Sequence, residues 1–459
     1  SIAGAYWRGD QKNAQLQRIH AIAFPTKEEL DAELVRLEEQ ARRDHRKIGK
    51  ELGLFTIAEE VGAGLPIWLP AGNVIRDELE RLARVTEHKA GYQRITTPHI
   101  TKADLYNRSG HLPYYAEDMY APIIIDEQEY YLRPMNCPHH HMAYAHDQHS
   151  YRDLPVRLTE YGQVYRYEAS GGLSGLMRVR GFCQNDAHIY CREDQAKAEF
   201  VSVMHMHAEY YRLFGIEDFW MRLSLPDFED LDKYVDDVEG WKKALGILKE
   251  AMDESGYPYR EVEGEAAFYG PKVDFMVKSV VGTEYAISTN QLDFMAAKRF
   301  DLNYTDADGE KKLVYVIHRA PLGSHERFTA FLIEHYAGRF PTWLSPVQAI
   351  VIPIADRHEA YAEQVRRRLF EADVDTVNGG IRVEADFAAE RMQKKIRNAQ
   401  NRQIPYMLVV GDAEAEAGAV AVRHREHGDL GAMSVDALID RIATEQKKRA
   451  DSPALAAAS

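Results

Sequence analysis

The chain has 459 residues, of which 45% are hydrophobic and 28% charged, and its formal net charge is −15. This composition is typical of a globular protein of two to four domains and excludes a disordered or fibrous chain. The acidic balance argues against a protein that coats nucleic acids without selectivity, although it is compatible with a local basic groove.

Cysteine usage and hydropathy bound the location of the protein. The three cysteines, Cys137, Cys183 and Cys191, are too few for a disulfide framework and favour a reducing, cytoplasmic location. We expect Cys183 and Cys191 to be small core residues of strands. No apolar run approaches the roughly 18 residues of a membrane span, and no signal peptide is recognisable. The first residue is Ser1 and not Met, which indicates part of a longer chain.

Local patterns predict helices and strands over the first 345 residues. The run Thr26-Lys27-Glu28-Glu29 is a capping box and predicts the start of a long charged helix. The predicted elements, in chain order, are a helix over 26–52, a helix over 70–91, a strand that ends at 98, strands over 155–166 and 178–190, a helix over 193–214, strands over 272–280 and 283–288, and a helix from 324.

The pattern changes at residues 340–346, FPTWLSP. A buried-strand run, VQAIVIPIA, is followed by a helix, a strand, a basic helix over 389–402, the strand YMLVV and a last helix. Alternating strands and helices are typical of a small α/β domain. We therefore predict two domains, residues 1–345 and residues 346–459.

The stretch RPMNCPHHHMAYAH places Cys137 beside His139, His140 and His141. Cysteine and histidine are common metal ligands. Three adjacent histidines cannot all turn toward one ion, because neighbours alternate on a strand and fan out on a helix. The stretch also lacks the second close-spaced pair of a structural zinc site. Taken alone, it favours a surface run of histidines over a metal site.

The two strands predicted over 155–166 and 178–190 flank a loop with three glycines, YEASGGLSGLM. Arg166 precedes the loop, and Arg178 and Arg180 follow it. Arginines on paired strands beside a long loop can clamp a polyphosphate through two hydrogen bonds each. A solvated hairpin with surface ion pairs is an equally good interpretation of these residues alone.

Several segments together resemble the class II aminoacyl-tRNA synthetases. Motif 2 of that class is similar to TEYGQVYRYEASGGLSGLMRVRGF, motif 3 to HRAPLGSHERF, and motif 1 to residues 62–98. With RPMNCP, QNDAHIYC, AFYGPKVDF and NQLDF, the resemblance is to the threonyl-tRNA synthetases and covers nearly the whole chain. It implies an α+β fold, in which an antiparallel sheet flanked by helices is followed by an α/β anticodon-binding domain.

The resemblance implies one zinc ion per subunit, bound by Cys137, His188 and His318. Without it, His188 and His318 would both be interpreted as buried structural histidines. Three protein ligands leave an open position on zinc. The resemblance implies that threonine fills it with its amino and hydroxyl groups. Valine lacks the hydroxyl, and a site built to bind that group can reject the analogue by about 10⁴-fold.

The remaining site residues also follow from the resemblance. It places Asp186 where it accepts the hydroxyl proton of threonine, with Gln184 and Tyr269 in the same pocket. It implies that Arg166 and Arg327 are catalytic, since the reaction depends on positioning and charge neutralisation. Magnesium is expected with the phosphates of ATP. The residues expected to contact ATP are Arg166, Glu168, Arg178, Lys272, Gln291 and Arg327.

The resemblance assigns the C-terminal domain to anticodon binding and makes Glu414 and Arg423 tRNA contacts. A basic helix could face phosphates or be an ordinary solvated helix; it carries Lys394, Lys395, Arg397 and Arg402. The chain departs from the family at Ala388-Ala389-Glu390, where Arg-Asn-Glu is usual, and at Gln403, where Arg is common.

We therefore predict a homodimeric, zinc-dependent threonine–tRNA ligase that acts in protein biosynthesis on L-threonine, ATP and tRNA(Thr). The rival interpretations are a seryl or prolyl synthetase and a non-catalytic RNA-binding paralogue. The segment SIAGAYWRGD resembles the junction that follows an editing domain. Because serine lacks only a methyl group, worth roughly 1–3 kcal/mol, we expect this polypeptide to activate serine and not to correct the error.

Overall fold

The computed structural model describes residues 5–6, 12, 14–16, 21–228, 234–279 and 282–449. It divides into two units, residues 1–43 and residues 44–459. Most of SIAGAYWRGD lies outside the described residues. Within the described part, no helix is long and apolar enough to cross a bilayer.

The first unit contains two short strands, β1 (Ala5–Tyr6) and β2 (Gln15–Leu16), and the helix α1 (Lys27–Arg43). The capping box is present, since the backbone N of Glu29 donates to Oγ1 of Thr26 at 3.2 Å. The single helix predicted over 26–52 is wrong. A separate helix, α2 (His45–Glu51), starts after Asp44, whose side chain accepts from the backbone N of Arg46 at 2.8 Å.

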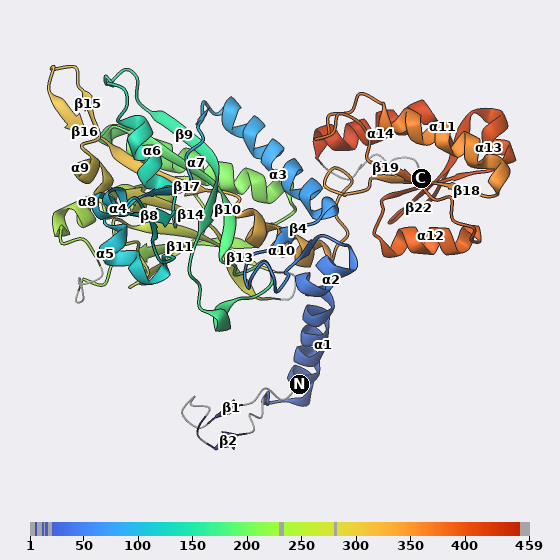
Figure 1. The fold of residues 1–459 in the computed structure, drawn as a ribbon, viewed down its shortest axis with the longest axis horizontal. Helices are drawn as coiled ribbons and strands as arrows, with labels where there is room; N and C mark the ends of the chain where they lie inside the picture. The colour runs from blue at the N-terminus through green and yellow to red at the C-terminus, as the bar shows by residue number, and fades with distance from the viewer. Residues whose placement is uncertain are drawn as a thin grey trace. The chain divides into compact units, whose positions relative to one another are not determined.

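The second unit is built on an eight-stranded sheet in the order β12-β11-β13-β14-β17-β10-β9-β5 (Figure 1). Its neighbours pair antiparallel except β11 with β12 and β5 with β9. The predicted α+β class with an antiparallel sheet is confirmed. The strands are β5 (Gln93–Arg94), β9 (Val156–Tyr165), β10 (Gly181–Cys191), β11 (Phe219–Leu225), β12 (Tyr259–Glu263), β13 (Lys272–Lys278), β14 (Glu284–Asp293) and β17 (Tyr315–Ala320).

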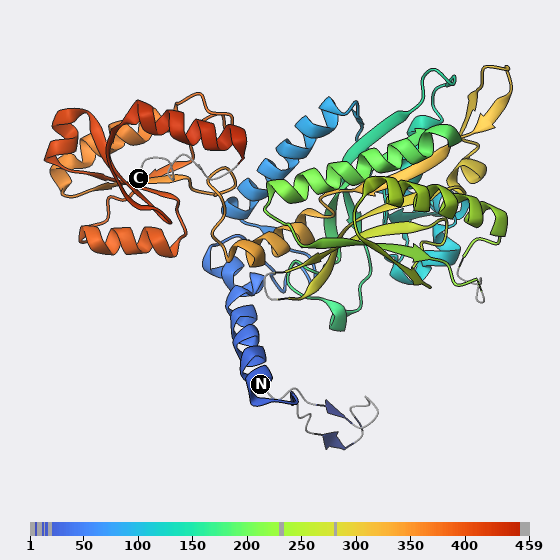
Figure 2. The ribbon, with the colours of Figure 1, turned by 180° about the vertical axis from the view of Figure 1, so that it is seen from behind.

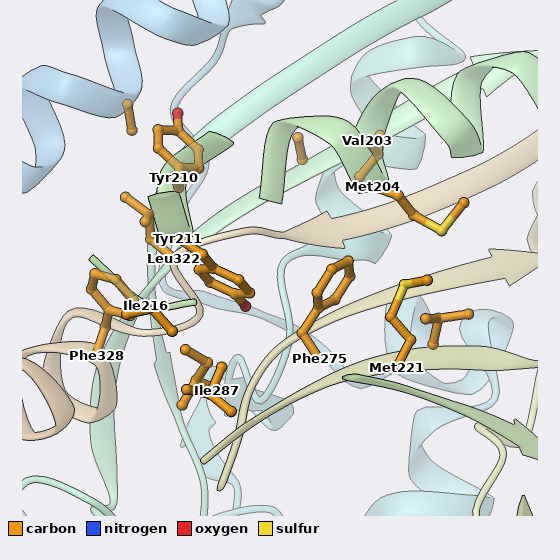
Figure 3. Packing of buried hydrophobic residues seen from close by; sticks show 14 of the residues in the cluster. Val203, Met204, Tyr210, Tyr211, Ile216, Met221, Phe275, Ile287, Leu322 and Phe328 are labelled. Atoms are coloured by element: carbon orange, nitrogen blue, oxygen red, sulfur yellow. The ribbon is translucent and has the colours of Figure 1, made fainter. Parts of the chain in front are cut away.

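Helices pack on this sheet and close the main core. They are α3 (Pro70–Lys89), α7 (Glu193–Leu213), α8 (Val238–Ser255) and α10 (His325–Tyr336). In the reverse view, the green helices α7 and α8 cross the near face of the sheet (Figure 2). Met204 and Tyr211 of α7 point toward Met221 of β11 and Phe275 of β13 (Figure 3), and all four are fully buried. Each such side chain contributes about 1.5–3 kcal/mol.

Smaller elements surround the sheet. Cys183 and Cys191 are buried in β10, as predicted. The additional strands are β3 (Phe55–Thr56), β4 (Ile67–Trp68), β6 (Ile100–Lys102), β7 (Ile123–Ile125), β8 (Gln128–Leu132), β15 (Asn303–Thr305) and β16 (Lys311–Leu313). The additional helices are α4 (Ala103–Ser109), α5 (His111–Tyr115), α6 (Cys137–Tyr144) and α9 (Ala296–Phe300), with short 3₁₀ turns at Ala116–Asp118 and Ser170–Gly172.

A second sheet of five strands, in the order β19-β18-β20-β21-β22, forms the C-terminal part. The parallel strands are β18 (Ala349–Pro353), β19 (Val383–Ala385) and β20 (Tyr406–Val410), and β21 (Ala419–His424) and β22 (Gly428–Ser434) add antiparallel. Two apolar clusters cover its two faces, one with α11 (Glu359–Phe370) and α14 (Val435–Lys448), the other with α12 (Met392–Asn401). A short helix, α13 (Asp412–Ala417), precedes β21, and a 3₁₀ turn at Asp356–His358 precedes α11.

This confirms the predicted small α/β domain. Both sheets lie in one compact unit, so the boundary at residue 346 stays a prediction.

Candidate active site

A cavity of about 600 Å³ opens on the eight-stranded sheet, and every site residue predicted in residues 1–345 lines it. The resemblance therefore selected side chains that the fold brings together. They are Cys137, Arg166, Glu168, Arg178, Gln184, Asp186, His188, Tyr269, Lys272, Gln291, His318 and Arg327.

Strand register explains why residues so far apart in the chain meet here. Lys272 of β13 lies opposite Gln291 of β14, Gln291 lies opposite His318 of β17, and His318 lies opposite His188 of β10. Directly opposed residues of antiparallel strands have Cβ atoms about 4.5–5.5 Å apart. The four side chains thus stand in one row across the sheet.

Cys137, His188 and His318 form a buried group whose ligand atoms all lie within 4.8 Å of one another. Cys137 is the first residue of α6. Nε2 of His188 lies 2.9 Å from Nδ1 of His318. Around one tetrahedral zinc ion, sulfur and nitrogen donors at about 2.0–2.3 Å would be roughly 3.3–3.7 Å apart. The donor types fit a single divalent ion, around which the two nitrogens would move apart by about 0.4 Å.

Burial shifts the pKa values of two members of this group in opposite directions. Burial lowers the pKa of His188 well below its ordinary value, so the ring is neutral, as a metal ligand must be. Burial raises the pKa of the Cys137 thiol, and the carboxylates of Asp186 and Asp293 raise it further. A bound cation would act in the opposite direction and favour the thiolate.

The run of three histidines is not a surface feature, and that interpretation is wrong. His139, His140 and His141 are 7%, 0% and 2% exposed, respectively. They lie on α6, which is buried along most of its length. As the resemblance implied, none of the three belongs to the group formed by Cys137, His188 and His318.

Asp186 is held beside the metal group by Asn136. Nδ2 of Asn136 donates to Oδ2 of Asp186 at 3.0 Å. This close approach needs a glycine on the neighbouring strand, because a Cβ at Gly162 would lie 2.3 Å from Nδ2 of Asn136. Burial raises the pKa of Asp186, and nearby His140 and the hydrogen bond from Asn136 oppose that effect.

The aromatic wall of the cavity touches the metal group directly. The ring of Tyr269 stacks on that of His318 with 5.1 Å between centroids. Its hydroxyl donates to Oε1 of Gln291, the next residue of the row. Tyr269 therefore links one predicted metal ligand to Gln291, one of the predicted ATP contacts.

Arginines gather at the other end of the cavity. Arg166 donates to the backbone oxygen of Pro134 at 3.2 Å and lies over the ring of Phe182. Arg327, on α10, donates to the backbone oxygen of Met177 at 3.2 Å. Burial lowers the pKa of Arg327, and the positive charges of Arg166 and Arg178 lower it further. Guanidinium groups this close together favour a polyanionic ligand.

Glu168 and Arg178 form an ion pair across the glycine loop, with 2.7 Å between Oε2 and Nε. The structure thus combines the two interpretations of the hairpin. Arg166 and Arg178 line the cavity, and Arg178 has a carboxylate partner. Arg180 does not line it and donates to the backbone oxygen of Glu168 at 2.9 Å.

Sequence reasoning did not single out several residues of the site. Asn136 lies within RPMNCP and Asp293 within NQLDF, so their motifs were identified and their roles were not. Arg222 and Asp274 also line the cavity and pair at 2.7 Å. Asp274 lies within AFYGPKVDF, whereas no pattern in the sequence marks Arg222.

The two predicted tRNA contacts lie on a helix and a strand of the C-terminal part, α13 and β21, which follow each other in the chain. Glu414 is half-buried in α13, and its Oε2 accepts from the backbone N of Gly411 at 2.9 Å. Arg423 is exposed on β21.

The basic helix α12 differs in part from the prediction of a solvent-facing cationic surface. Lys395 is buried, and its Nζ donates to the backbone oxygen of Asp386 at 2.8 Å. Arg402, just after the helix, pairs with Glu384 at 2.7 Å. Lys395 is therefore not one of the residues that could face phosphates, because its amine binds the backbone of the loop before α12.

Comparison with known proteins agrees with this architecture. Residues 120–336 match the family described as tRNA synthetase class II core domain (G, H, P, S and T), and residues 348–445 match the family described as anticodon binding domain. Threonine–tRNA ligase of Deinococcus radiodurans is 53% identical over 93% of this chain and 64% of its own length. That of Bacillus subtilis, ligase 1, is 50% identical over 98% of this chain and 69% of its own length.

Solved structures give the same result. The crystal structure named for the RNA binding domain of threonyl-tRNA synthetase from Cryptosporidium parvum superposes with a TM-score of 0.82 at 36% identity, covering 87% of this chain and 98% of that one. A putative threonyl-tRNA synthetase from Aeropyrum pernix superposes with a TM-score of 0.75 at 27% identity, covering 90% and 97%.

The chain spans slightly less than two thirds of the Deinococcus relative and slightly more than two thirds of the Bacillus one. Identity near one half over almost all of this chain, together with both matched domains and the cavity described above, establishes its relationship. The chain belongs to the threonine–tRNA ligase family of class II aminoacyl-tRNA synthetases.

Proposed function

We propose that the protein activates L-threonine with ATP and transfers it from the adenylate to tRNA(Thr). The observation that carries the proposal is the convergence of Cys137, His188 and His318 on a cavity that Arg166, Arg178 and Arg327 also line. A structural zinc site uses four protein ligands, whereas three ligands facing a cavity suit the recognition of a small substrate.

The proposed metal is Zn²⁺, held by Cys137, His188 and His318. When bound, it supplies a Lewis acid that accepts the amino and hydroxyl groups of threonine. Asp186, Gln184 and Tyr269 line the same part of the cavity. Asp186 is the proposed acceptor of the hydroxyl hydrogen. Since a hydroxyl-requiring site can reject its deoxy analogue by about 10⁴-fold, valine should be a very poor substrate.

The arginine end of the cavity is the proposed ATP site. The chemistry there is positioning and charge neutralisation: the threonine carboxylate attacks the α-phosphorus, and pyrophosphate leaves. Arg166 and Arg327 act on the phosphates as catalytic residues, and Glu168 contacts the adenine edge once it releases Arg178. Arg178, Lys272 and Gln291 complete the site, and Mg²⁺ accompanies the phosphates.

The proposal keeps residues 1–345 as the catalytic domain and residues 346–459 as the anticodon-binding domain. In the latter, Glu414 and Arg423 contact the anticodon of tRNA(Thr). We also propose that the protein is a homodimer. The proposed location is the cytoplasm, because three free cysteines favour a reducing compartment.

The test combines metal analysis with amino-acid-dependent exchange of pyrophosphate into ATP. We expect about one zinc per chain and exchange with threonine, weaker exchange with serine, and very little with valine. Cys137→Ser should lose both zinc and exchange, whereas Cys191→Ser, a buried cysteine outside the cavity, should keep both.

The same experiment separates the rival functions. Exchange that depends on serine or proline and is insensitive to Cys137→Ser would assign a neighbouring synthetase. Zinc binding without exchange for any amino acid would assign a non-catalytic paralogue.

A further inference from the structure

Helix α6 starts at the proposed zinc ligand Cys137 and carries the histidine run. Residues three and four positions apart share a helix face, so His140 and His141 lie on the face of Cys137 and His139 does not. The rings of His140 and His188 have centroids 4.5 Å apart. Nδ1 of His140 lies 2.9 Å from Nδ1 of His188. The helix thus brings His140 into close contact with a ligand of the proposed metal, while the ring of His141 lies farther from His188, with 5.7 Å between centroids.

The other nitrogen of His140 meets a buried carboxylate. Nε2 of His140 lies 3.1 Å from Oε2 of Glu160, on β9. Oε1 of Glu160 accepts from the backbone N of Thr97 at 3.2 Å and from Nη2 of Arg133 at 3.2 Å. Paired with Arg133, Glu160 is an ionised carboxylate and can only accept hydrogen bonds. The proton of a neutral His140 is therefore on Nε2.

We propose that His140 and Glu160 are positioning residues of the metal centre, an inference that rests on the metal site of the proposed function. With its proton on Nε2, His140 accepts at Nδ1 the hydrogen on Nδ1 of His188. Nε2 of His188 then keeps its lone pair. On the far side, Asp293 accepts from Nε2 of His318 at 3.0 Å, so Nδ1 of His318 also keeps its lone pair.

These hydrogen bonds leave two acceptor nitrogens facing each other. Nε2 of His188 and Nδ1 of His318 lie 2.9 Å apart, and in these tautomers neither nitrogen carries a hydrogen. A cation between two lone pairs removes their repulsion. Glu160 and Asp293 thus act from opposite sides, one through a second imidazole and one directly, to direct both ligand nitrogens at the same point.

His139 provides a control, whereas His141 does not. Nδ1 of His141 lies 3.0 Å from the hydroxyl of Tyr190, and one of its ring nitrogens lies within 4.8 Å of ligand atoms of Asp293 and His318. Neither ring nitrogen of His139 has a hydrogen-bond partner among the described residues. The hydrogen-bonded chain from Glu160 through His140 to His188 is called the relay here. His139 is adjacent to His140 in the chain and nearly as buried, so His139→Gln is a control that changes a neighbouring buried histidine and leaves the relay intact.

Glu160→Gln reverses the relay without changing its shape. Two obligate donors, the backbone N of Thr97 and the guanidinium of Arg133, meet Oε1, so the amide oxygen must occupy that position. The amide NH₂ then replaces Oε2, which also accepts from the hydroxyl of Thr97 at 2.7 Å. One hydrogen of the NH₂ is donated to Nε2 of His140, and the other is donated to Oγ1 of Thr97. This moves the proton of His140 to Nδ1 and forces that of His188 onto Nε2, the nitrogen that should bind the metal.

The experiment measures zinc affinity by competition with a chromophoric chelator and records the visible spectrum of the Co²⁺-loaded full chain. We expect Glu160→Gln to weaken zinc binding by about 10–100-fold and to alter the cobalt bands. His139→Gln should stay within about twofold of wild type. Equal zinc affinity and an unchanged cobalt spectrum in Glu160→Gln, in a protein with a wild-type unfolding midpoint, would overturn the inference.

A second variant covers a folding failure of the first. His140→Asn removes the ring from the relay and should also weaken zinc by about tenfold or more, and wild-type affinity there would overturn the inference equally. The proposed metal site itself fails in a different way. It is refuted if wild-type zinc binding persists in Cys137→Ser, whereas the positioning role alone is refuted if Cys137→Ser loses zinc and the relay variants do not.

Discussion

Glu326 is a buried carboxyl group beside Arg327 and is 2% exposed. It accepts from the backbone N of Cys183 at 3.0 Å and from Nε1 of Trp68 at 3.3 Å. Burial raises its pKa to about 7 from 4.5. The folded state holds this proton more tightly than the unfolded state does. The contribution of the proton to the free energy of unfolding is therefore fully present below pH 4.5 and is lost as the pH rises to about 7. The loss is about 3 kcal/mol.

Urea unfolding of wild type and Glu326→Gln, from pH 4.5 to 8, measures this effect. The amide of Glu326→Gln does not titrate, so the free energy of unfolding of wild type should fall relative to that of the variant by about 3 kcal/mol across the window. Parallel pH profiles would show that this carboxyl group is not protonated in the folded state.

Gly162 controls how Asn136 reaches Asp186. A methyl group there overlaps the Asn136 amide and should separate it from Asp186. A hydrogen bond to a charged group is worth about 1.5–3 kcal/mol, so Gly162→Ala should raise the KM for threonine by roughly 10–100-fold and that for ATP much less. Pyrophosphate exchange with each substrate varied in turn measures both constants.

Gly246→Ala is the control for that change. Gly246 is exposed on α8, and a Cβ there meets nothing within 4 Å. Its KM values should equal those of wild type. A rise in both KM values together in Gly162→Ala would indicate general disruption of the sheet and not loss of the Asn136 contact.

At the scale of elements, the carboxylate of Glu87 on α3 accepts hydrogen bonds from three strands of the active-site sheet. Glu87 accepts from Nη1 of Arg319 on β17 at 2.8 Å, from Nδ2 of Asn185 on β10 at 2.7 Å, and from Oγ1 of Thr159 on β9 at 3.1 Å. Arg319 and Asn185 adjoin His318 and Asp186 in the chain and, by strand alternation, point to the opposite face. The helix thus supports the site from behind.

Removing that carboxylate should be costly. Glu87→Ala leaves the buried guanidinium of Arg319 without its partner, and we expect a loss of about 3–5 kcal/mol in the free energy of unfolding. The double variant Glu87→Ala/Arg319→Met should recover part of that loss, because no charge is then left unpaired. If the loss in the double variant equals the sum of the losses in Glu87→Ala and Arg319→Met, the pair does not interact.

Elements with strong local signals could be predicted from the sequence. The helix expected over 70–91 is observed at Pro70–Lys89, and that expected over 193–214 at Glu193–Leu213. The break at Asp44 was missed, since one capping side chain interrupts an otherwise continuous helical pattern. The strands β21 and β22 were missed although they are longer than the predicted strand β20, because their place in the sheet depends on tertiary pairing.

The site was less accessible to local reasoning. Alternation on β10 places Asp186 and His188 on one face, but the meeting of His188 with His318 depends on the register of distant strands. Only the family resemblance connected them. The contacts that orient the ligands, such as that of Glu160 with His140, leave no mark in the sequence, because each joins residues on different elements.

At the scale of the whole molecule, α3 also contacts the C-terminal sheet. Glu78, nine residues before Glu87 and therefore on the opposite side of the helix, accepts from Nη1 of Arg382 at 2.6 Å. Arg382 also donates to the backbone oxygens of Ser345 and Trp343. One helix thus holds the active-site strands with one carboxylate and the proposed anticodon-binding domain with another.

Glu78→Ala should therefore affect the two half-reactions differently. Loss of Glu78 leaves Arg382 buried without its carboxylate, which loosens the C-terminal sheet from α3 while the contacts of Glu87 persist. We expect threonine-dependent pyrophosphate exchange to change by less than about threefold. Aminoacylation kcat/KM for tRNA should fall by about tenfold or more, a loss of at least about 1.4 kcal/mol. Asp375→Asn, at an exposed residue that pairs with Arg81 of the same helix, is the matched control and should leave both rates unchanged. Equal losses in the two half-reactions would show that α3 transmits the change to the amino-acid site, and the division of labour between its two carboxylates would then be wrong.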